Sequence, residues 1–219
     1  LEVMSKFTAS VTSLLEQLLS PYASSWRLDY ASFRPRQEKG RQVKFKARND
    51  LLHVDAFPTR PTYGYRILRF FLNINPAESR HWVTAKSFEH LLGTYIGTPE
   101  MPLPAGSEIV FHTWRRHLTR WAKSLGLPVA APSRYDEFML RLHDHLKSNR
   151  TFQKAEAQYK LEFLPNSSWM VFTDFVPHAA LSGQFALEQT FLIDPNSMLQ
   201  PEKSPLHLLE KASGVRSLS

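Results

Sequence analysis

Two strand-like blocks, residues 27–76 and 158–194, are separated by a long segment of helical pattern, residues 84–157. Both blocks are rich in β-branched and aromatic residues and are broken by Pro and Gly, which is typical of short strands joined by turns. Strands from two distant parts of the chain then have to share one core. This order predicts a mainly β fold with α additions, a β-sandwich or jelly roll whose site lies at the mouth of the sheets.

The segments before, between and after these blocks are expected to belong to the same single domain, residues 1–219. Residues 5–19 place apolar side chains at helical spacing and stop before Pro21, which predicts an N-terminal amphipathic helix. The insert, residues 84–157, carries two basic helical patterns, HTWRRHLTRWAKSLGLP and SRYDEFMLRLHDHLKSNRTFQKAEAQY. Residues 195–219 are polar and are expected to form a loosely attached C-terminal tail.

Composition excludes several classes of protein. Among 219 residues there is no cysteine, so a disulfide scaffold, a thiolate metal site and a cysteine nucleophile are all excluded. The chain also lacks the G-x-S-x-G, H-E-x-x-H and P-loop motifs of common hydrolases. The net charge of +7 predicts an anionic partner, which can be a nucleic acid, an acidic lipid surface or an acidic substrate.

The sequence predicts no membrane span, because no run of roughly 18 or more apolar residues occurs. No secretory-signal pattern is seen at the N-terminus of the sequence given, and the absence of cysteine fits a cytoplasmic location. We therefore expect a cytoplasmic protein that is able to bind to a membrane surface.

Histidine spacing points to a metal centre. In the strand-like segment LLHVDAF, His53 and Asp55 are two residues apart and project from the same face, so both can reach one ion. His143 and His145 have the same spacing in a helical segment, where it turns them to different sides, and we interpret them as surface residues. A His-x-Asp pair also arises by chance, and either residue can instead be hydrogen-bonded in a core or on the surface.

A third ligand is needed to complete the two-histidine, one-carboxylate triad of non-haem iron(II) oxygenases. His178 is the best candidate, because it follows the strand SSWMVFTDFVP and precedes a further strand after a turn of small residues. We therefore predict that His53, Asp55 and His178 bind iron.

An iron oxygenase of this type commonly uses 2-oxoglutarate, whose distal carboxylate needs a fixed cation such as arginine. In YRILRFFLNIN, Arg69 and Asn73 share the more polar face of the predicted strand, whereas Arg66 lies on the other face. Arg69 is thus the first candidate for the cosubstrate, Arg66 the second, and Asn73 a further one. The alternative is that these arginines only cover surface carboxylates.

Three segments, YASFRPRQEKGR, HVDAFPTRPTYGYRILRFFLNINP and SSWMVFTDFVPHAALSGQFALEQTF, resemble the Kdo hydroxylases, also called Kdo dioxygenases. Together they cover about a third of the chain, and the HxD followed by RPT-x-G-x-RILR and NINP is long enough to be specific. The insert and the C-terminus do not match residue by residue. The resemblance implies a double-stranded β-helix with His53, Asp55 and His178 as iron ligands.

The resemblance also implies a reaction. It predicts an Fe(II)- and 2-oxoglutarate-dependent dioxygenase that uses O2 to hydroxylate the 3-deoxy carbon of Kdo, giving Ko, succinate and CO2. The substrate would be Kdo-bearing lipid A, the inner core of lipopolysaccharide, on the cytoplasmic face of the inner membrane of a Gram-negative cell. Phe71 and Trp169 are candidates for an aromatic lining that excludes water, while Phe172 is more simply a core residue.

An acidic sugar on a phosphorylated lipid gives the positive charge a specific interpretation. Arg34, Arg60 and Arg66 are the candidates for binding the substrate. The insert adds a cluster that an interfacial helix would have, and that a solvated helix with two core tryptophans explains equally well: Trp114, Arg115, Arg116, Arg120, Trp121 and Lys123.

Two alternatives remain from the residues alone. One is a related iron oxygenase acting on another anionic target, such as an alkylated nucleic acid. The other is a non-catalytic basic β-sandwich that binds lipopolysaccharide or nucleic acid, in which the predicted iron ligands are ordinary residues. The second alternative predicts neither iron binding nor cosubstrate turnover.

Overall fold

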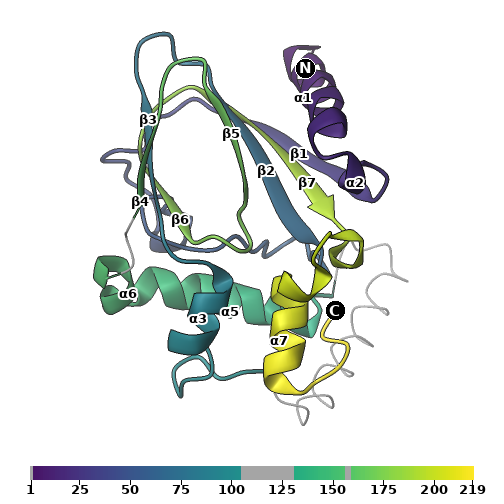
Figure 1. The fold of residues 1–219 in the computed structure, drawn as a ribbon. Coiled ribbons are helices and arrows are strands. Elements are labelled where there is room, and N and C mark those ends of the chain that lie inside the picture. The colour runs from purple at the N-terminus through teal and green to yellow at the C-terminus, as the bar shows by residue number, and fades with distance from the viewer. Residues whose placement is uncertain (1, 105–130, 156–158) are drawn as a thin grey trace, which may run out of the picture.

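The computed structural model describes residues 2–104, 131–155 and 159–219. Two antiparallel sheets face each other, and most of the helices lie together at one end of the sheets, below them in Figure 1. Helix α1 lies apart from the other helices, along the outer side of the larger sheet. This is the mainly β, jelly-roll architecture with added helices that the sequence predicts.

The larger sheet combines strands from both strand-like blocks. Its order is β1-β7-β2-β5, so that the first and the last strand of the chain are neighbours. The strands are Trp26–Arg34 (β1), Arg66–Asn73 (β2), Ser168–Phe172 (β5) and Ala186–Ile193 (β7). Strand β2 is central, and Arg69 stands opposite Val171 on one side and Thr190 on the other.

The smaller sheet has the order β4-β3-β6. Its strands are Arg80–Thr84 (β3), Tyr159–Phe163 (β4) and His178–Ser182 (β6). An isolated antiparallel bridge between His53 and His178 extends the pairing beyond β6. A segment from the first strand-like block is thereby brought next to one from the second.

The two faces of β2 have different environments. Phe70 belongs to a core that also contains Phe191 of β7 and Phe7, Val11 and Leu15 of helix α1 (Glu2–Leu18). The rings of Phe7 and Phe70 are 6.4 Å apart. Because alternate residues project to opposite sides, helix α1 covers the outer face of this sheet and leaves the face with Arg69 directed inward.

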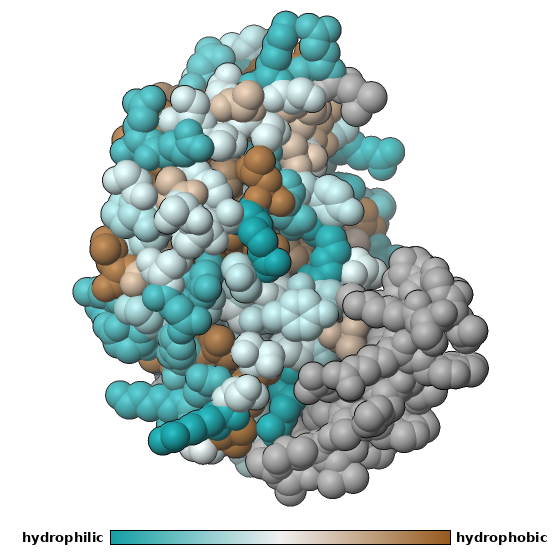
Figure 2. Space-filling view, turned by 90° about the vertical axis from the view of Figure 1, so that its right-hand side faces the viewer, coloured by the Kyte–Doolittle hydropathy of each residue, from teal (hydrophilic) through white to brown (hydrophobic). Residues whose placement is uncertain are grey.

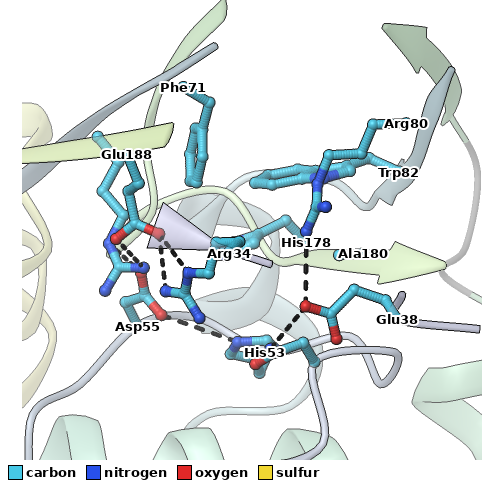
Figure 3. Close-up of a pocket in the computed structure, with 12 residues that line it drawn as sticks. Arg34, Glu38, His53, Asp55, Phe71, Arg80, Trp82, His178, Ala180 and Glu188 are labelled. Atoms are coloured by element: carbon cyan, nitrogen blue, oxygen red, sulfur yellow. Dashed lines mark hydrogen bonds and ion pairs between the residues drawn. The ribbon is translucent and has the colours of Figure 1, made fainter. Parts of the chain in front are cut away.

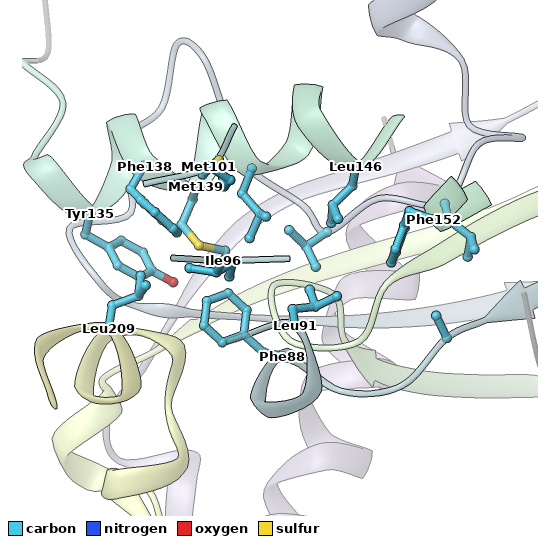
Figure 4. Close-up of a cluster of buried hydrophobic side chains, with 14 of the residues drawn as sticks. Phe88, Leu91, Ile96, Met101, Tyr135, Phe138, Met139, Leu146, Phe152 and Leu209 are labelled. Carbon is cyan, nitrogen blue, oxygen red and sulfur yellow. The ribbon is translucent and has the colours of Figure 1, made fainter. Parts of the chain in front are cut away.

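A second core joins the helices to the end of the sheets. Helix α5 (Arg134–Ser148) begins with a capping box in which Ser133 and Asp136 satisfy each other's backbone N–H groups. Its apolar face packs against α3 (Phe88–Thr94), α6 (Arg150–Ala155) and α7 (Pro205–Ser213), and Phe138, Phe88 and Leu209 are among the buried residues of this core (Figure 4). The short elements that remain are α2 (Ser20–Ala23), η1 (Phe45–Ala47), η3 (Pro195–Ser197) and η4 (Pro201–Lys203).

The structure corrects the expectation of a loose C-terminal tail. Residues 205–213 form α7, and Leu206, Leu209 and Leu218 are buried in the second core. The Ser204 side chain caps the helix by accepting a hydrogen bond from the His207 N–H, and Gly214 ends it in the left-handed conformation. The apolar residues that pack here are sparse in a polar sequence, which is why their pattern was missed.

The insert is shorter and more mixed than expected. Thr84 still belongs to β3, and helix begins only at Phe88. The predicted helix with Trp114, Arg116 and Trp121 lies outside the described residues. On the face viewed in Figure 2, hydrophobic residues of the described chain are scattered among polar ones.

Candidate metal centre

The predicted metal ligands converge at the bridge between the two blocks. The His53 N–H donates to the His178 carbonyl at 3.1 Å, and the His178 N–H donates to the His53 carbonyl at 2.9 Å. The Asp55 N–H donates to the Thr173 carbonyl at 2.8 Å. As a result, ligand atoms of His53, Asp55 and His178 lie within 4.8 Å of one another, and all three residues are buried.

Backbone carbonyls fix the orientation of both imidazoles in the same way. Nδ1 of His53 lies 2.7 Å from the Leu51 carbonyl, and Nδ1 of His178 lies 2.9 Å from the Val176 carbonyl. Because a carbonyl oxygen only accepts, each Nδ1 must carry the proton. The lone pair is then on Nε2, the nitrogen left to bind a metal, as in metal sites whose ligands are held by an outer layer of hydrogen bonds.

Electrostatics favour the metal-binding protonation states. Burial, and then the nearby His178, hold the pKa of His53 well below its usual range, and burial also lowers the pKa of His178. Burial by itself would favour the neutral form of Asp55, but the positive charge of Arg69 opposes this effect, and the pKa of this carboxyl lies well below its usual range. The site therefore offers two neutral imidazoles and one carboxylate.

A small charged cavity of about 40 Å³ contains these ligands. Figure 3 shows cationic and anionic side chains around it in pairs. The residues that line it, beside the three ligands, are Arg34, Glu38, Asn49, Arg69, Phe71, Arg80, Trp82, Ala180 and Glu188. Five strands of the two sheets, β1, β2, β3, β6 and β7, contribute to this lining, so the cavity lies between the sheets.

Arg69 is at the cavity, as the alternation along β2 predicts. Its Nε lies 3.0 Å from Oδ2 of Asp55, an ion pair without hydrogen-bond alignment, and its Nη1 lies 3.0 Å from Oε1 of Glu188. Arg34 donates two hydrogen bonds to the other oxygen of Glu188, at 3.0 and 2.7 Å. Glu188 thus holds two arginines beside the metal ligands.

Three other predicted site residues are not among those that line the cavity. Arg66 is buried on the opposite face of β2, where its Nε donates to Asp174 at 2.6 Å. Arg60 pairs with Asp29. The Asn73 amide donates to three backbone carbonyls, that of Glu78 in the turn after β2 and those of Phe163 and Leu164 at the end of β4.

The predicted aromatic residues also differ in whether they line the cavity. Phe71 lines the cavity and stacks on Trp169 with ring centroids 5.2 Å apart. Phe172 packs against the core under α1 and lies beneath the guanidinium of Arg66, in agreement with a core role.

Sequence reasoning missed the contribution of β3. Arg80 and Trp82 share one face of this strand and line the cavity, and the Trp82 ring stacks on His178 with centroids 5.2 Å apart. Glu38, from the loop after β1, lies 3.6 Å from Arg80. The segment RHWVT has the alternation of a strand, but its position next to the expected insert hid this signal.

The donor set fits iron(II). Two imidazoles and a carboxylate, arranged on one side of a cavity, form the facial triad of non-haem iron oxygenases and leave further coordination positions toward the cavity. Oδ1 of Asp55 lies 3.7 Å from Nε2 of His53, which is beyond hydrogen-bond distance, so the two atoms face each other without binding each other and both can bind one ion.

Comparison with known proteins agrees with this donor set. The family model of the 3-deoxy-D-manno-oct-2-ulosonic acid (Kdo) hydroxylases matches residues 1–216. The chain belongs to this family. Membership makes it a hydroxylase, and it confirms the predicted family and enzyme class.

Solved structures of the Kdo hydroxylase KdoO, a non-haem Fe(II) α-ketoglutarate-dependent dioxygenase, are similar to the whole chain. The complex with α-ketoglutarate and Fe(III) has 38% identity and a TM-score of 0.83, over 96% of this chain and 68% of that one. The complexes with cobalt(II) and with succinate and Fe(III) each have 37% identity and a TM-score of 0.85, over 100% of this chain and 70% of theirs. No curated protein matches the chain.

Proposed function

We propose that this chain is an Fe(II)- and 2-oxoglutarate-dependent dioxygenase that hydroxylates Kdo. The observation that carries the proposal is the convergence of His53, Asp55 and His178, with both imidazoles oriented by backbone carbonyls. Iron and 2-oxoglutarate together supply the oxidation, in which O2 gives one oxygen atom to a C–H bond of the sugar and the other to succinate, with release of CO2.

The residues of the chain would bind and orient the reactants. Arg69 is our candidate for the distal carboxylate of 2-oxoglutarate, because its guanidinium lies beside the metal ligand Asp55. Arg34 is our candidate for the carboxylate of Kdo, on the other side of Glu188. A carboxylate that binds to Arg69 or Arg34 competes with Glu188. Binding of a substrate to either arginine therefore replaces the ion pair of that arginine with Glu188.

Arg80 is a second candidate for the cosubstrate. Its Nη1 donates to the Gly183 carbonyl at 3.1 Å, but its Nε and the Nε1 of Trp82 are buried without a hydrogen-bond partner among the described residues. Two unpaired donors on one face of β3 favour an anion near this strand. Arg66, Arg60 and Asn73 are not retained for ligand binding, because each is bound to protein groups outside the cavity.

Aromatic side chains would exclude water from the reaction. Phe71 and Trp82 meet edge to face across the cavity, with ring centroids 4.8 Å apart. An apolar wall beside the metal keeps the oxidation directed to a positioned C–H bond and away from solvent and the protein itself.

The substrate we propose is Kdo-bearing lipid A, with the hydroxyl entering at the 3-deoxy carbon to give Ko. The net charge of +7 supports an anionic lipid surface as the place of action, and we propose a peripheral location on the cytoplasmic face of the inner membrane. None of the helices in the described residues is long and apolar enough to cross a bilayer.

Anaerobic titration tests the centre. Wild type and His53→Ala are titrated with iron(II) and 2-oxoglutarate while the weak visible charge-transfer absorption of the chelate is followed. We expect absorption that requires iron, 2-oxoglutarate and His53. With Kdo-bearing lipid A and O2, succinate should then form together with a lipid that has gained one oxygen atom.

The alternatives give different results. Absence of the absorption in folded, iron-treated wild type would contradict the oxygenase and favour a non-catalytic binding module. Absorption without oxidation of Kdo-bearing lipid A, but with an alkylated nucleic acid as substrate, would keep the centre and change the substrate.

A further inference from the structure

The segment with His53 lies at the edge of the smaller sheet. On one side it is bound to β6 through the two hydrogen bonds of the His53–His178 bridge. On its other side lie helices α5 and α6 (Figure 1). Inside a sheet, the backbone N–H and C=O groups on this side of the segment would be hydrogen-bonded to a neighbouring strand. At this edge, side chains of the two helices bind them instead.

Gln153 of α6 binds the residue before His53. Its Oε1 accepts from the Leu52 N–H at 2.9 Å, and its Nε2 donates to the Leu52 carbonyl at 2.9 Å. The same Nε2 donates to the Leu146 carbonyl of α5 at 2.8 Å. One amide therefore satisfies both backbone groups of Leu52, as a paired strand residue would, and ties them to the helices.

His143 of α5 binds the residue after His53. Its Nδ1 lies 2.7 Å from the Val54 carbonyl, and because that oxygen only accepts, Nδ1 donates. The His143 ring also meets the ring of His53 edge to face, with centroids 4.9 Å apart. Val54 stands between His53 and Asp55, so His143 holds the peptide that joins the two ligands.

We propose that His143 and Gln153 are positioning residues for the metal centre. This inference rests on the proposed function and adds residues of the helical layer to it. His53 and Asp55 reach one ion only while the backbone at Val54 stays extended, and the two helical side chains fix this backbone on both sides of His53. Such outer contacts typically change metal affinity about 10- to 100-fold.

Cobalt(II) titration of the full chain, followed by visible absorption, tests the proposal. His143→Leu removes the donor to Val54, whereas His143→Asn keeps a side-chain N–H close to the position of Nδ1. We expect about 10- to 100-fold weaker cobalt binding and an altered cobalt spectrum in His143→Leu and in Gln153→Leu. His143→Asn should regain most of the affinity.

His145→Leu is the matched control, because His145 is on the same helix and its side chain contacts Asn149, not the ligand segment. It should bind cobalt like wild type. Thermal unfolding of the metal-free variants separates loss of the site from loss of the fold.

The outcomes are distinct. Wild-type cobalt affinity in folded His143→Leu and Gln153→Leu would overturn the inference, and so would equal losses in His143→Leu and His143→Asn. If His143→Leu does not fold, His143→Asn and Gln153→Leu decide by the same criterion. Failure of wild type to bind cobalt would instead overturn the metal centre itself, and with it the proposed function.

Discussion

The three arginines of the cavity differ in what they already bind. Among the described residues, Arg69 is paired with Asp55 and Glu188, Arg34 with Glu188 alone, and Arg80 with Glu38 at the longer distance of 3.6 Å. The carboxylates of 2-oxoglutarate and of Kdo are both proposed to bind in this cavity, so different arginines must bind them. Their individual substitution is the most direct test at the scale of the residue.

We expect Arg69→Gln to weaken 2-oxoglutarate binding about 10- to 100-fold, because a charge-assisted hydrogen bond contributes about 1.5–3 kcal/mol. Arg34→Gln should leave this affinity within about threefold and lower kcat/KM for the Kdo substrate instead. Both quantities follow from the charge-transfer titration and from succinate formation. A loss of cosubstrate affinity confined to Arg80→Gln would move the anchor to β3.

Arg66→Gln is the control for this prediction. Its side chain and that of Asp174 are 5% and 1% exposed, so removing the guanidinium leaves a buried carboxylate unpaired. We expect a loss of about 3–5 kcal/mol in the free energy of unfolding, as for other broken buried pairs, with 2-oxoglutarate affinity unchanged in the folded fraction.

At the residue scale, the sequence predicts what depends on local geometry. Strand alternation places His53 with Asp55 and separates Arg69 from Arg66, and the structure agrees with both. Glu38 and Arg80 meet only because the loop after β1 folds over β3, and no sequence spacing predicts that contact.

At the scale of the element, the helices are part of the scaffold of the site. Strands from the two blocks pair as expected, because alternation and turn residues are local signals. The role of α7 was missed, because its packing on α3 and α5 depends on residues far away in the chain. Likewise, the interpretation of His143 as a surface residue is wrong, because its ring is hydrogen-bonded to the Val54 carbonyl and meets the ring of His53.

Leu209 on α7 gives the test at this scale. Its side chain is fully buried in the core shared with α5 and α3, so Leu209→Ala should lower the free energy of unfolding by about 2–5 kcal/mol. Urea unfolding measures this loss. Leu199→Ala, at a side chain that is 73% exposed, is the control and should change stability by less than about 0.5 kcal/mol. Equal small effects would mean that the C-terminal segment is loosely attached after all.

At the scale of the whole molecule, the metal-free fold has to keep several buried histidines neutral. Burial is the largest cause of the lowered pKa of His53, His143 and His178, whose ordinary value is 6.5. In the unfolded chain these groups take up protons as the pH falls through this value, whereas in the folded chain they take them up only at lower pH. Protons therefore favour unfolding below about pH 6.5.

We expect the free energy of unfolding of the metal-free protein, measured in urea, to fall steadily between about pH 7 and about pH 5.5. Each buried histidine contributes up to about 1.4 kcal/mol per pH unit. His143→Asn, which retains a hydrogen-bond donor, should flatten this dependence. Equal slopes in wild type and His143→Asn would show that His143 is not held neutral by the fold.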